Sequence, residues 1–319
     1  MTDVLISVGL LVVGFVLLIK GADFFVEGSS SVAKMLKVPS IIIGLTIVAM
    51  GTSLPECAVS ITASLTNNNA LAVSNAVGSN IFNLMVVCGF CALFNPLAVD
   101  KGTLKKEFPF SIICAMLLLV LGYIGMVLGR PDGIILIVLF AGFIIWMVRS
   151  ALRARAEASD EEYEVLPVWK CIVFIIGGII AIKFGGDFVV NGASTIAAKM
   201  GLSQNLIGLT IVACGTSLPE LVTSVVAAKK NELDMALGNV IGSNIFNILF
   251  VLGIAAAMSP IGFIMENVID IIILMVLSLV VWGFAWTKQK LDKKEGIAML
   301  IMSTHFTYFT QRNTRYICR

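Results

Sequence analysis

The sequence predicts an all-α polytopic membrane protein with ten transmembrane helices, arranged as two inverted-topology repeats of five helices each. Three observations lead to this fold class. Of the 319 residues, 58% are hydrophobic and 13% are charged, which is about half the charged fraction of a typical soluble domain. Long apolar runs without charges are separated by short polar segments. Two sequence blocks of the first half also recur in the second half at one constant offset, so the chain is internally duplicated.

The composition excludes two classes of protein and two kinds of structural site. The mean hydropathy of +1.00 is incompatible with a disordered chain, and no basic patch indicates binding to nucleic acid. An odd number of cysteines without regular spacing predicts neither a disulfide framework nor a zinc site. The seven cysteines lie mostly inside apolar runs, at Cys57, Cys88, Cys91, Cys114, Cys171, Cys214 and Cys318.

Ten runs of the chain are long and apolar enough to cross a membrane, which takes about 20 residues per helix. The first run has no basic segment before it and no small-residue cleavage site, so it is predicted to be a span and not a signal peptide. A polar turn at Asn67, Asn68 and Asn69 divides the second span from the third. The predicted spans cover roughly residues 4–26, 39–66, 71–95, 108–129, 132–149, 168–190, 204–228, 235–259, 266–287 and 295–312.

The distribution of Lys and Arg predicts the orientation of the spans. With both termini outside, the inner loops collect fifteen of these residues and the outer loops five. The acidic residues of the central inner loop are interpreted as part of a solvated linker, with a regulatory cation site as the alternative; they are Asp160, Glu161, Glu162 and Glu164.

The internal duplication is carried by two blocks. Gly44–Glu56 reads GLTIVAMGTSLPE and Gly208–Glu220 reads GLTIVACGTSLPE, with twelve of thirteen positions identical. Asn75–Asn83 (NAVGSNIFN) and Asn239–Asn247 (NVIGSNIFN) lie at the same offset of 164. Because five is an odd number of spans, the second copy must enter the membrane from the opposite side. The predicted organisation is a first repeat at 1–152, a cytoplasmic linker at 153–167 and a second repeat at 168–319.

The first block combines a helix interruption with a carboxylate. Pro55 and Pro219 cannot donate the backbone hydrogen bond of a regular helix. Glu56 and Glu220 follow them directly, well inside their spans. A carboxylate at the bilayer centre costs roughly 2.5–3.5 kcal/mol on insertion scales, so it indicates a functional site by default. The alternative is a protonated glutamate bonded to a neighbouring helix, which two duplicated motifs disfavour.

The second block supplies hydroxyl and amide oxygens. Ser79 and Asn83 are four residues apart, on one helix face, and Ser243 and Asn247 repeat the arrangement. Such residues can also serve as contacts between helices. Together with the Thr, Ser and Glu residues of the first block, they predict an all-oxygen site, which suits Ca²⁺. Na⁺ is nearly the same size and accepts the same ligands. Two carboxylates can balance one Ca²⁺ or an equivalent charge of Na⁺ or H⁺, which is the basis for exchange.

The paired GTSLPE and GSNIFN blocks resemble the two alpha-repeats of the sodium/calcium exchanger family, within the calcium/cation antiporter superfamily. The resemblance implies that spans 2, 3, 7 and 8 form the ion-binding core and that spans 1 and 6 move across it. For Ca²⁺ it implies Glu56 and Glu220 with the backbone carbonyls of Thr52 and Thr216. For Na⁺ it adds Ala49, Ser53, Ser79, Ala213, Ser217 and Ser243, and Asn83 and Asn247 complete the site.

Two features depart from the family pattern. Many members have an aspartate where this chain has Asn247, and the tail from Ser303 is too polar and aromatic for a full tenth span. The central loop is short, which suggests a minimal prokaryotic protein of the cell (inner) membrane.

The predicted function is Ca²⁺/Na⁺ antiport by alternating access, without an organic cofactor. The expected partners are the lipid bilayer, Ca²⁺ and Na⁺, and no nucleic acid. A Ca²⁺/H⁺ antiporter is the nearest alternative and a cation channel a more distant one. An enzyme is not expected, because the lone His305 lies in the tail and no nucleophile–base pair accompanies it.

Overall fold

The computed structural model describes residues 2–66, 69–157, 165–202, 207, 211 and 213–304. In these segments the chain is a helical, multi-pass membrane protein. Seven helices are long and apolar enough to span a bilayer, and a bent helix pair, Ser40–Thr52 with Leu54–Leu65, can form an eighth span. The turn at Asn67 and Asn68, the acidic cluster of the linker, the start of the seventh predicted span and the tail from residue 305 lie outside the described residues.

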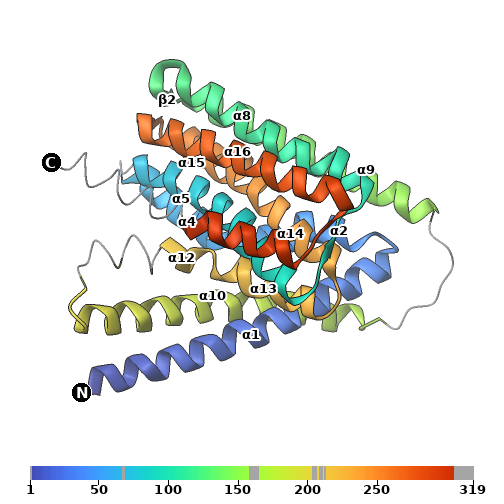
Figure 1. Cartoon of the computed structure of the whole chain (residues 1–319), viewed down its shortest axis with the longest axis horizontal. Helices are drawn as coiled ribbons and strands as arrows, with labels where there is room; N and C mark the ends of the chain where they lie inside the picture. The colour runs from blue at the N-terminus through green and yellow to red at the C-terminus, as the bar shows by residue number, and fades with distance from the viewer. Residues whose placement is uncertain are drawn as a thin grey trace.

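The first half of the chain is helical with two short strands (Figure 1). Its elements are α1 (Thr2–Leu36), α2 (Ser40–Ile43), η1 (Gly44–Val48), α3 (Ala49–Thr52), α4 (Leu54–Leu65), α5 (Asn69–Phe82), η2 (Asn83–Val87), α6 (Cys88–Phe94), β1 (Leu97–Ala98), α7 (Lys101–Lys105), α8 (Glu107–Tyr123), η3 (Ile124–Met126), β2 (Val127–Leu128) and α9 (Arg130–Glu157).

The second half follows the same order. Its elements are α10 (Val168–Lys199), α12 (Ala213–Thr216), α13 (Leu218–Lys229), α14 (Leu233–Phe246), η5 (Asn247–Val251), α15 (Leu252–Met258), β3 (Ile261–Gly262), α16 (Met265–Lys288) and β4 (Lys290–Leu291), followed by helical residues 293–304. Several helices extend beyond the predicted spans, because the polar residues that flank the apolar runs are also helical. In particular, α9 continues through residue 157 and so takes up the first five residues of the predicted linker.

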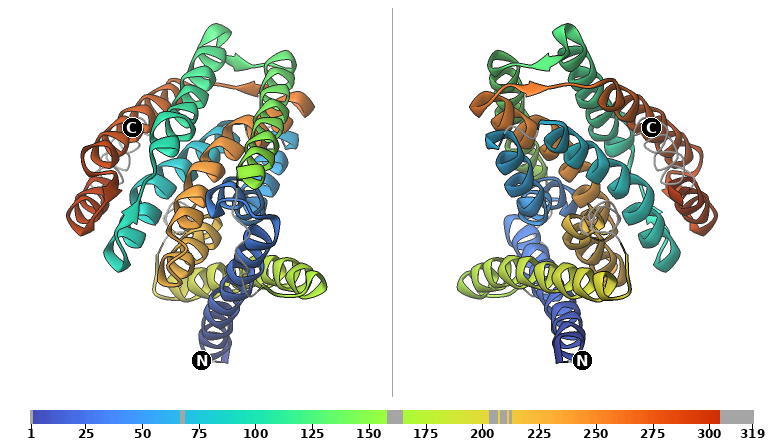
Figure 2. Two further views of the ribbon diagram at one scale, coloured as in Figure 1. Left: turned by 90° about the vertical axis from the view of Figure 1, so that its right-hand side faces the viewer. Right: turned by 90° about the vertical axis from the view of Figure 1, so that its left-hand side faces the viewer.

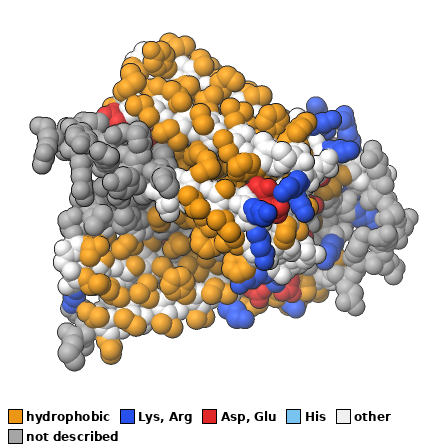
Figure 3. Space-filling model, viewed as in Figure 1, with side chains coloured by type: hydrophobic (Ala, Val, Ile, Leu, Met, Phe, Trp, Pro, Cys, Tyr) orange, Lys and Arg blue, Asp and Glu red, His pale blue; other side chains and the backbone are white. Residues whose placement is uncertain are grey.

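Apolar side chains cover much of the molecular surface. Large hydrophobic residues on the outer helices are exposed, including Leu5 at 78% and Trp169 at 65%. Figure 3 shows a largely hydrophobic face with most of its charged side chains gathered toward one end. In water such a surface would be strongly unfavourable, whereas lipid tails cover it without cost. The buried centre is formed by α5 and α14, and every residue from Met235 to Phe246 is buried.

Helices α1 and α10 form an antiparallel pair along one side of the molecule (Figures 1 and 2). Their backbones touch at glycines spaced seven residues apart. A Cβ atom on Gly185 would lie 2.8 Å from the carbonyl oxygen of Gly14, and a Cβ on Gly178 would lie 2.8 Å from that of Gly21. Small residues allow this close approach in a membrane, where packing rather than hydrophobicity drives association. The repeat offset of 164 relates Gly14 to Gly178 and Gly21 to Gly185.

In the described part of the chain, four two-residue strands link the two halves; they were not predicted from the sequence. β1 pairs with β4 and β2 pairs with β3, both antiparallel. Adding 164 to the numbers of β1 gives β3, and adding 164 to those of β2 gives 291–292, which overlaps β4 at Leu291 with a shift of one residue. Each pair therefore joins a strand of one repeat to the non-equivalent strand of the other, and the two pairs are reciprocal.

Candidate functional site

The two interrupted helices place a glutamate at the start of a helix. Between α3 and α4, Ser53 leaves the helical conformation with φ −84° and ψ 13°, and the axis bends by 50° there. Ser217 adopts φ −93° and ψ 5° between α12 and α13. Pro55 lies in the first turn of α4. Backbone N–H groups in this turn have no acceptor within the helix, so proline costs no hydrogen bond there. Glu56 then lies in this first turn.

Close backbone contact holds the first interrupted helix against α14. A Cβ on Gly44 would lie 2.6 Å from the carbonyl oxygen of Met235, and a Cβ on Gly238 would lie 2.7 Å from that of Ile41. Only glycine fits at such distances, which real Cβ atoms essentially never show. The contact positions residues of the first repeat beside those of the second at the centre of the molecule.

Each glutamate is bonded by a serine from the other repeat. Ser53 donates a hydrogen bond from Oγ to Oε1 of Glu220 at 2.7 Å. Ser217 donates from Oγ to Oε1 of Glu56 at 3.2 Å. Ser79 also donates to this Oε1, at 3.2 Å, and its Oγ lies 3.0 Å from Oγ of Ser217. Both glutamates are fully buried, so the hydroxyl groups replace water as their hydrogen-bond donors.

Four oxygen atoms of the predicted site residues are buried and have no hydrogen-bond partner among the described residues. They are Oε2 of Glu56, Oε2 of Glu220, Oδ1 of Asn83 and Oδ1 of Asn247. Leaving a buried acceptor unpaired costs about 1–3 kcal/mol, and more for a charged group. All four atoms are acceptors, which is the kind of ligand that a hard cation takes. The donor set therefore fits an oxygen-coordinated cation.

The other predicted site residues have several different environments. Thr52 donates to the carbonyl oxygens of Val48 and Ala49 and contacts Oδ1 of Asn239 at 3.1 Å. Ser243 donates to the carbonyl oxygen of Ala49 at 3.5 Å. Ala49 O also accepts from the backbone amide of Ser53, so internal hydrogen bonds already occupy it. In the second repeat, α12 runs from Ala213 to Thr216, the counterparts of Ala49 and Thr52.

Four buried or half-buried asparagines near the glutamates and amides were not predicted from the sequence. Asn75 donates to the carbonyl oxygen of Glu56 at 3.3 Å, and Asn239 donates to that of Glu220 at 3.5 Å. Asn80 and Asn244 bond to each other across the repeats. All four belong to the second duplicated block, and the recurrence of their amides was the signal available in the sequence.

The two predicted amide ligands also begin an unusual backbone segment. Asn83 is the first residue of the π-helix η2, and Asn247 is the first residue of the π-helix η5. π-Helical turns are rare and often accompany functional sites. The sequences of η2 and η5, NLMVV and NILFV, do not differ in character from the sequence of an ordinary α-helix. The π-helical segments could therefore be found only in the structure.

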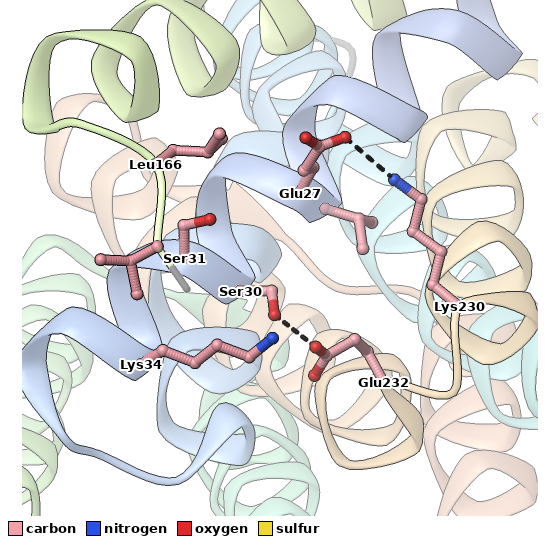
Figure 4. Close-up of a pocket in the computed structure, with 9 residues that line it drawn as sticks. Glu27, Ser30, Ser31, Lys34, Leu166, Lys230 and Glu232 are labelled. Carbon is pink, nitrogen blue, oxygen red and sulfur yellow. Dashed lines mark hydrogen bonds and ion pairs between the residues drawn. The ribbon is translucent and has the colours of Figure 1, made fainter. Parts of the chain in front are cut away.

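A second polar region lies away from the glutamates, in a cavity of about 640 Å³ beside α1. Lys230, between α13 and α14, is 2.6 Å from Oδ1 of Asp23 and 3.5 Å from Oε2 of Glu27. Figure 4 shows the pairing of Lys230 with Glu27 and the hydrogen bond from Ser30 to Glu232. These contacts join α1 to the connection between α13 and α14. Because this cavity contains two lysines, Lys34 and Lys230, it suits a cation less well than the buried glutamates do.

Comparison with known proteins gives consistent matches over nearly the whole chain. Residues 6–149 and 170–310 match the family described as Sodium/calcium exchanger protein. The chain is 37% identical to the inner membrane protein YrbG of Escherichia coli, covering 80% of this chain and 81% of that protein. It is 30% identical to the sodium/calcium exchanger MaX1 of Methanosarcina acetivorans, covering 93% of this chain and 96% of that protein.

Solved structures match the fold at similar coverage. A structure of the sodium-calcium exchanger NCX_Mj, soaked with 2.5 mM Na⁺ and 10 mM Sr²⁺, superimposes with a TM-score of 0.83 at 34% sequence identity. The match covers 94% of this chain and 97% of that one. The residues matched by the family description include α4, α5, α13 and α14.

Proposed function

Because this chain belongs to the sodium/calcium exchanger protein family, we propose that it moves Ca²⁺ across the membrane in exchange for Na⁺ by alternating access. The family consists of transporters and not of enzymes. The observation that carries the proposal is the set of four buried, unpartnered oxygen atoms, two from each repeat. Their chemistry fits a hard cation, and the two carboxylates offer a charge that one Ca²⁺ or a matching number of Na⁺ ions would balance.

The proposed architecture is ten transmembrane helices in two inverted-topology repeats, at 1–152 and 168–319, joined by a cytoplasmic linker at 153–167. The reciprocal contacts support a two-fold relation between the repeats. Ser53 bonds Glu220 as Ser217 bonds Glu56, with both pairs offset by 164. The strand pairs exchange in a similar way, with a shift of one residue. An odd number of spans per repeat would place such repeats in opposite orientations.

The proposed Ca²⁺ ligands are the carboxylates of Glu56 and Glu220 with the backbone carbonyls of Thr52 and Thr216. The amide oxygens of Asn83 and Asn247 complete the middle of the site. The proposed Na⁺ positions add Ala49, Ser53, Ser79, Ala213, Ser217 and Ser243. The contacts of Ser53, Ser79 and Ser217 with the glutamates support their inclusion.

Alternating access would be produced by movement of the α1–α10 pair across the remaining helices. Two features support this division. The backbones of α1 and α10 are in close contact with each other through glycines, which favours movement as a unit. By contrast, the polar contacts of α1 with the α13–α14 connection involve partly exposed ion pairs, which are individually weak.

Ca²⁺ flux in liposomes tests the proposed function. With purified protein in liposomes loaded with Na⁺, an outward Na⁺ gradient is expected to drive Ca²⁺ uptake, measured with a trapped indicator. A pH gradient without Na⁺ is expected to drive none, because the site is proposed to exchange Ca²⁺ for Na⁺. Protein-free liposomes provide the control. Uptake driven by the pH gradient alone would instead assign Ca²⁺/H⁺ antiport, and single-channel currents would assign a channel.

Thiol labelling in cells tests the proposed topology, in which both termini lie outside the cell (inner) membrane. A single cysteine introduced at Glu161, in a background where the seven native cysteines are replaced, is expected to resist impermeant thiol reagents in intact cells. A cysteine at Asp132, at the start of α9, is expected to react. The physical basis is the excess of Lys and Arg in the proposed inner loops. The reverse labelling pattern would overturn this orientation.

A further inference from the structure

We propose that Asn80 and Asn244 are positioning residues, which orient the amide groups of Asn247 and Asn83 so that each presents its oxygen to the ion. The inference rests on the proposed function and extends it to residues that do not touch the ion themselves. It follows from a closed network of hydrogen bonds in which four amides, two from each repeat, are joined across α5 and α14.

Two backbone carbonyls fix the direction of this network. Asn80 donates from Nδ2 to the carbonyl oxygen of Asn244 at 3.1 Å, and Asn244 donates from Nδ2 to the carbonyl oxygen of Asn80 at 3.3 Å. A backbone carbonyl can only accept. The nitrogen of each side-chain amide must therefore point at the carbonyl, and the oxygen must point the other way. All of these groups are buried, so water does not compete for them.

The orientations of the Asn80 and Asn244 amides in turn fix those of the Asn247 and Asn83 amides. Oδ1 of Asn80 accepts from Nδ2 of Asn247 at 3.1 Å, and Oδ1 of Asn244 accepts from Nδ2 of Asn83 at 3.3 Å. Once the nitrogens of Asn247 and Asn83 are engaged, their oxygens point away from the network. These are the same two Oδ1 atoms that are buried without a partner.

The amide oxygens lie on the helix face that carries the other site residues. Asn83, the first residue of η2, follows Ser79 of α5 by four residues, which places both side chains on one face of the continuous helix, and Ser79 bonds Glu56. Without the network, an amide could rotate by 180° about its last bond with little cost, since its oxygen and nitrogen have similar shapes. Rotation would replace an acceptor with an N–H donor and repel the cation. The network thus selects the cation-binding orientation.

Double-mutant cycles test the inference, with Ca²⁺ flux and Ca²⁺-dependent thermal stabilisation as readouts. Asn80→Ala is expected to raise the half-saturating Ca²⁺ concentration about 10-fold, the scale found for outer partners of metal ligands, with little change in maximal flux. In an Asn247→Ala background the same substitution is expected to change it less than about 2-fold, because the amide it orients is gone. In an Asn83→Ala background its effect is expected to persist. Asn244→Ala should behave reciprocally.

Controls separate positioning from general support of the fold. Asn267→Ala removes another fully buried amide, which bonds Ser74 outside the site. It is expected to lower thermal stability and leave the half-saturating Ca²⁺ concentration unchanged. If Asn80→Ala does not fold, the near-isosteric Asn80→Leu enters the same cycles. Equal effects of the Asn80 substitution in the Asn247→Ala and wild-type backgrounds would overturn the inference. A wild-type protein without Ca²⁺ stabilisation or flux would instead refute the proposed function.

Discussion

Replacing Glu56 or Glu220 with glutamine is expected to abolish Ca²⁺ exchange. Each substitution removes one of the two negative charges proposed to bind the ion. Loss of one partner from a buried charge pair costs about 3–5 kcal/mol, which corresponds to a loss of affinity greater than about 100-fold. The fold should survive, since an amide is cheaper to bury than a carboxylate and its oxygen can still accept the serine hydrogen bonds.

The measurement is Na⁺-driven Ca²⁺ uptake in liposomes at equal amounts of inserted protein. Glu266→Gln provides a matched control, because it makes the same chemical change at an exposed position in the first turn of α16. This control is expected to transport at the wild-type rate. Near-normal uptake by either the Glu56→Gln or the Glu220→Gln variant would remove the central basis of the proposed function.

Adding methyl groups at the contact between α1 and α10 is expected to destabilise the protein and slow transport. In the double variant Gly178→Ala with Gly185→Ala, each new Cβ would lie within 2.8 Å of a backbone atom of α1. Since a backbone cannot move aside as a flexible side chain can, the helices must separate. Overpacking of this kind costs about 1–3 kcal/mol. Thermal unfolding and Ca²⁺ flux of the purified protein would measure both effects.

The neighbouring glycines give an unusually close control. Added Cβ atoms at Gly177 and Gly186 would meet nothing within 4 Å. The double variant Gly177→Ala with Gly186→Ala is therefore expected to be neutral, or more stable by up to about 1 kcal/mol per site, because alanine favours the helix. Equal unfolding temperatures for the two double variants would contradict a backbone contact between α1 and α10.

Much of the fold could be predicted because a membrane helix has a simple physical signature. Charge-free runs identified α1, α5, α14 and α16, and the recurrence of GTSLPE identified the interrupted helices. Helix ends were predicted less well. α1 continues through Glu27 to Leu36 and α9 continues to Glu157, since polar residues near the interface or against a neighbouring helix do not end a helix. The paired strands were not predicted, because a strand of two residues is too short to show the alternation of polar and apolar side chains that identifies a β-strand.

The glutamates and serines could be identified from the sequence, because a carboxylate in an apolar span is costly and therefore conspicuous. The oxygen-bearing residues of GTSLPE and GSNIFN do meet across the repeats, as the bonds of Ser53 and Ser217 show. Asn80 could not be distinguished from a residue that merely packs between helices. Its significance depends on which partner its nitrogen meets, and that is a property of the assembled helices rather than of the local sequence.

The contacts of Lys230 imply that salt acts unequally on the two attachments of α1. The side chains of Lys230, Asp23 and Glu27 are 32%, 35% and 44% exposed. Mobile ions screen exposed charges over a Debye length of about 8 Å at 0.15 M ionic strength, so these pairs weaken as ionic strength rises. The glycine contact with α10 involves no net charge and is not screened. High salt is therefore expected to weaken the attachment of α1 to the α13–α14 connection. The packing contact between α1 and α10 is expected to be unaffected.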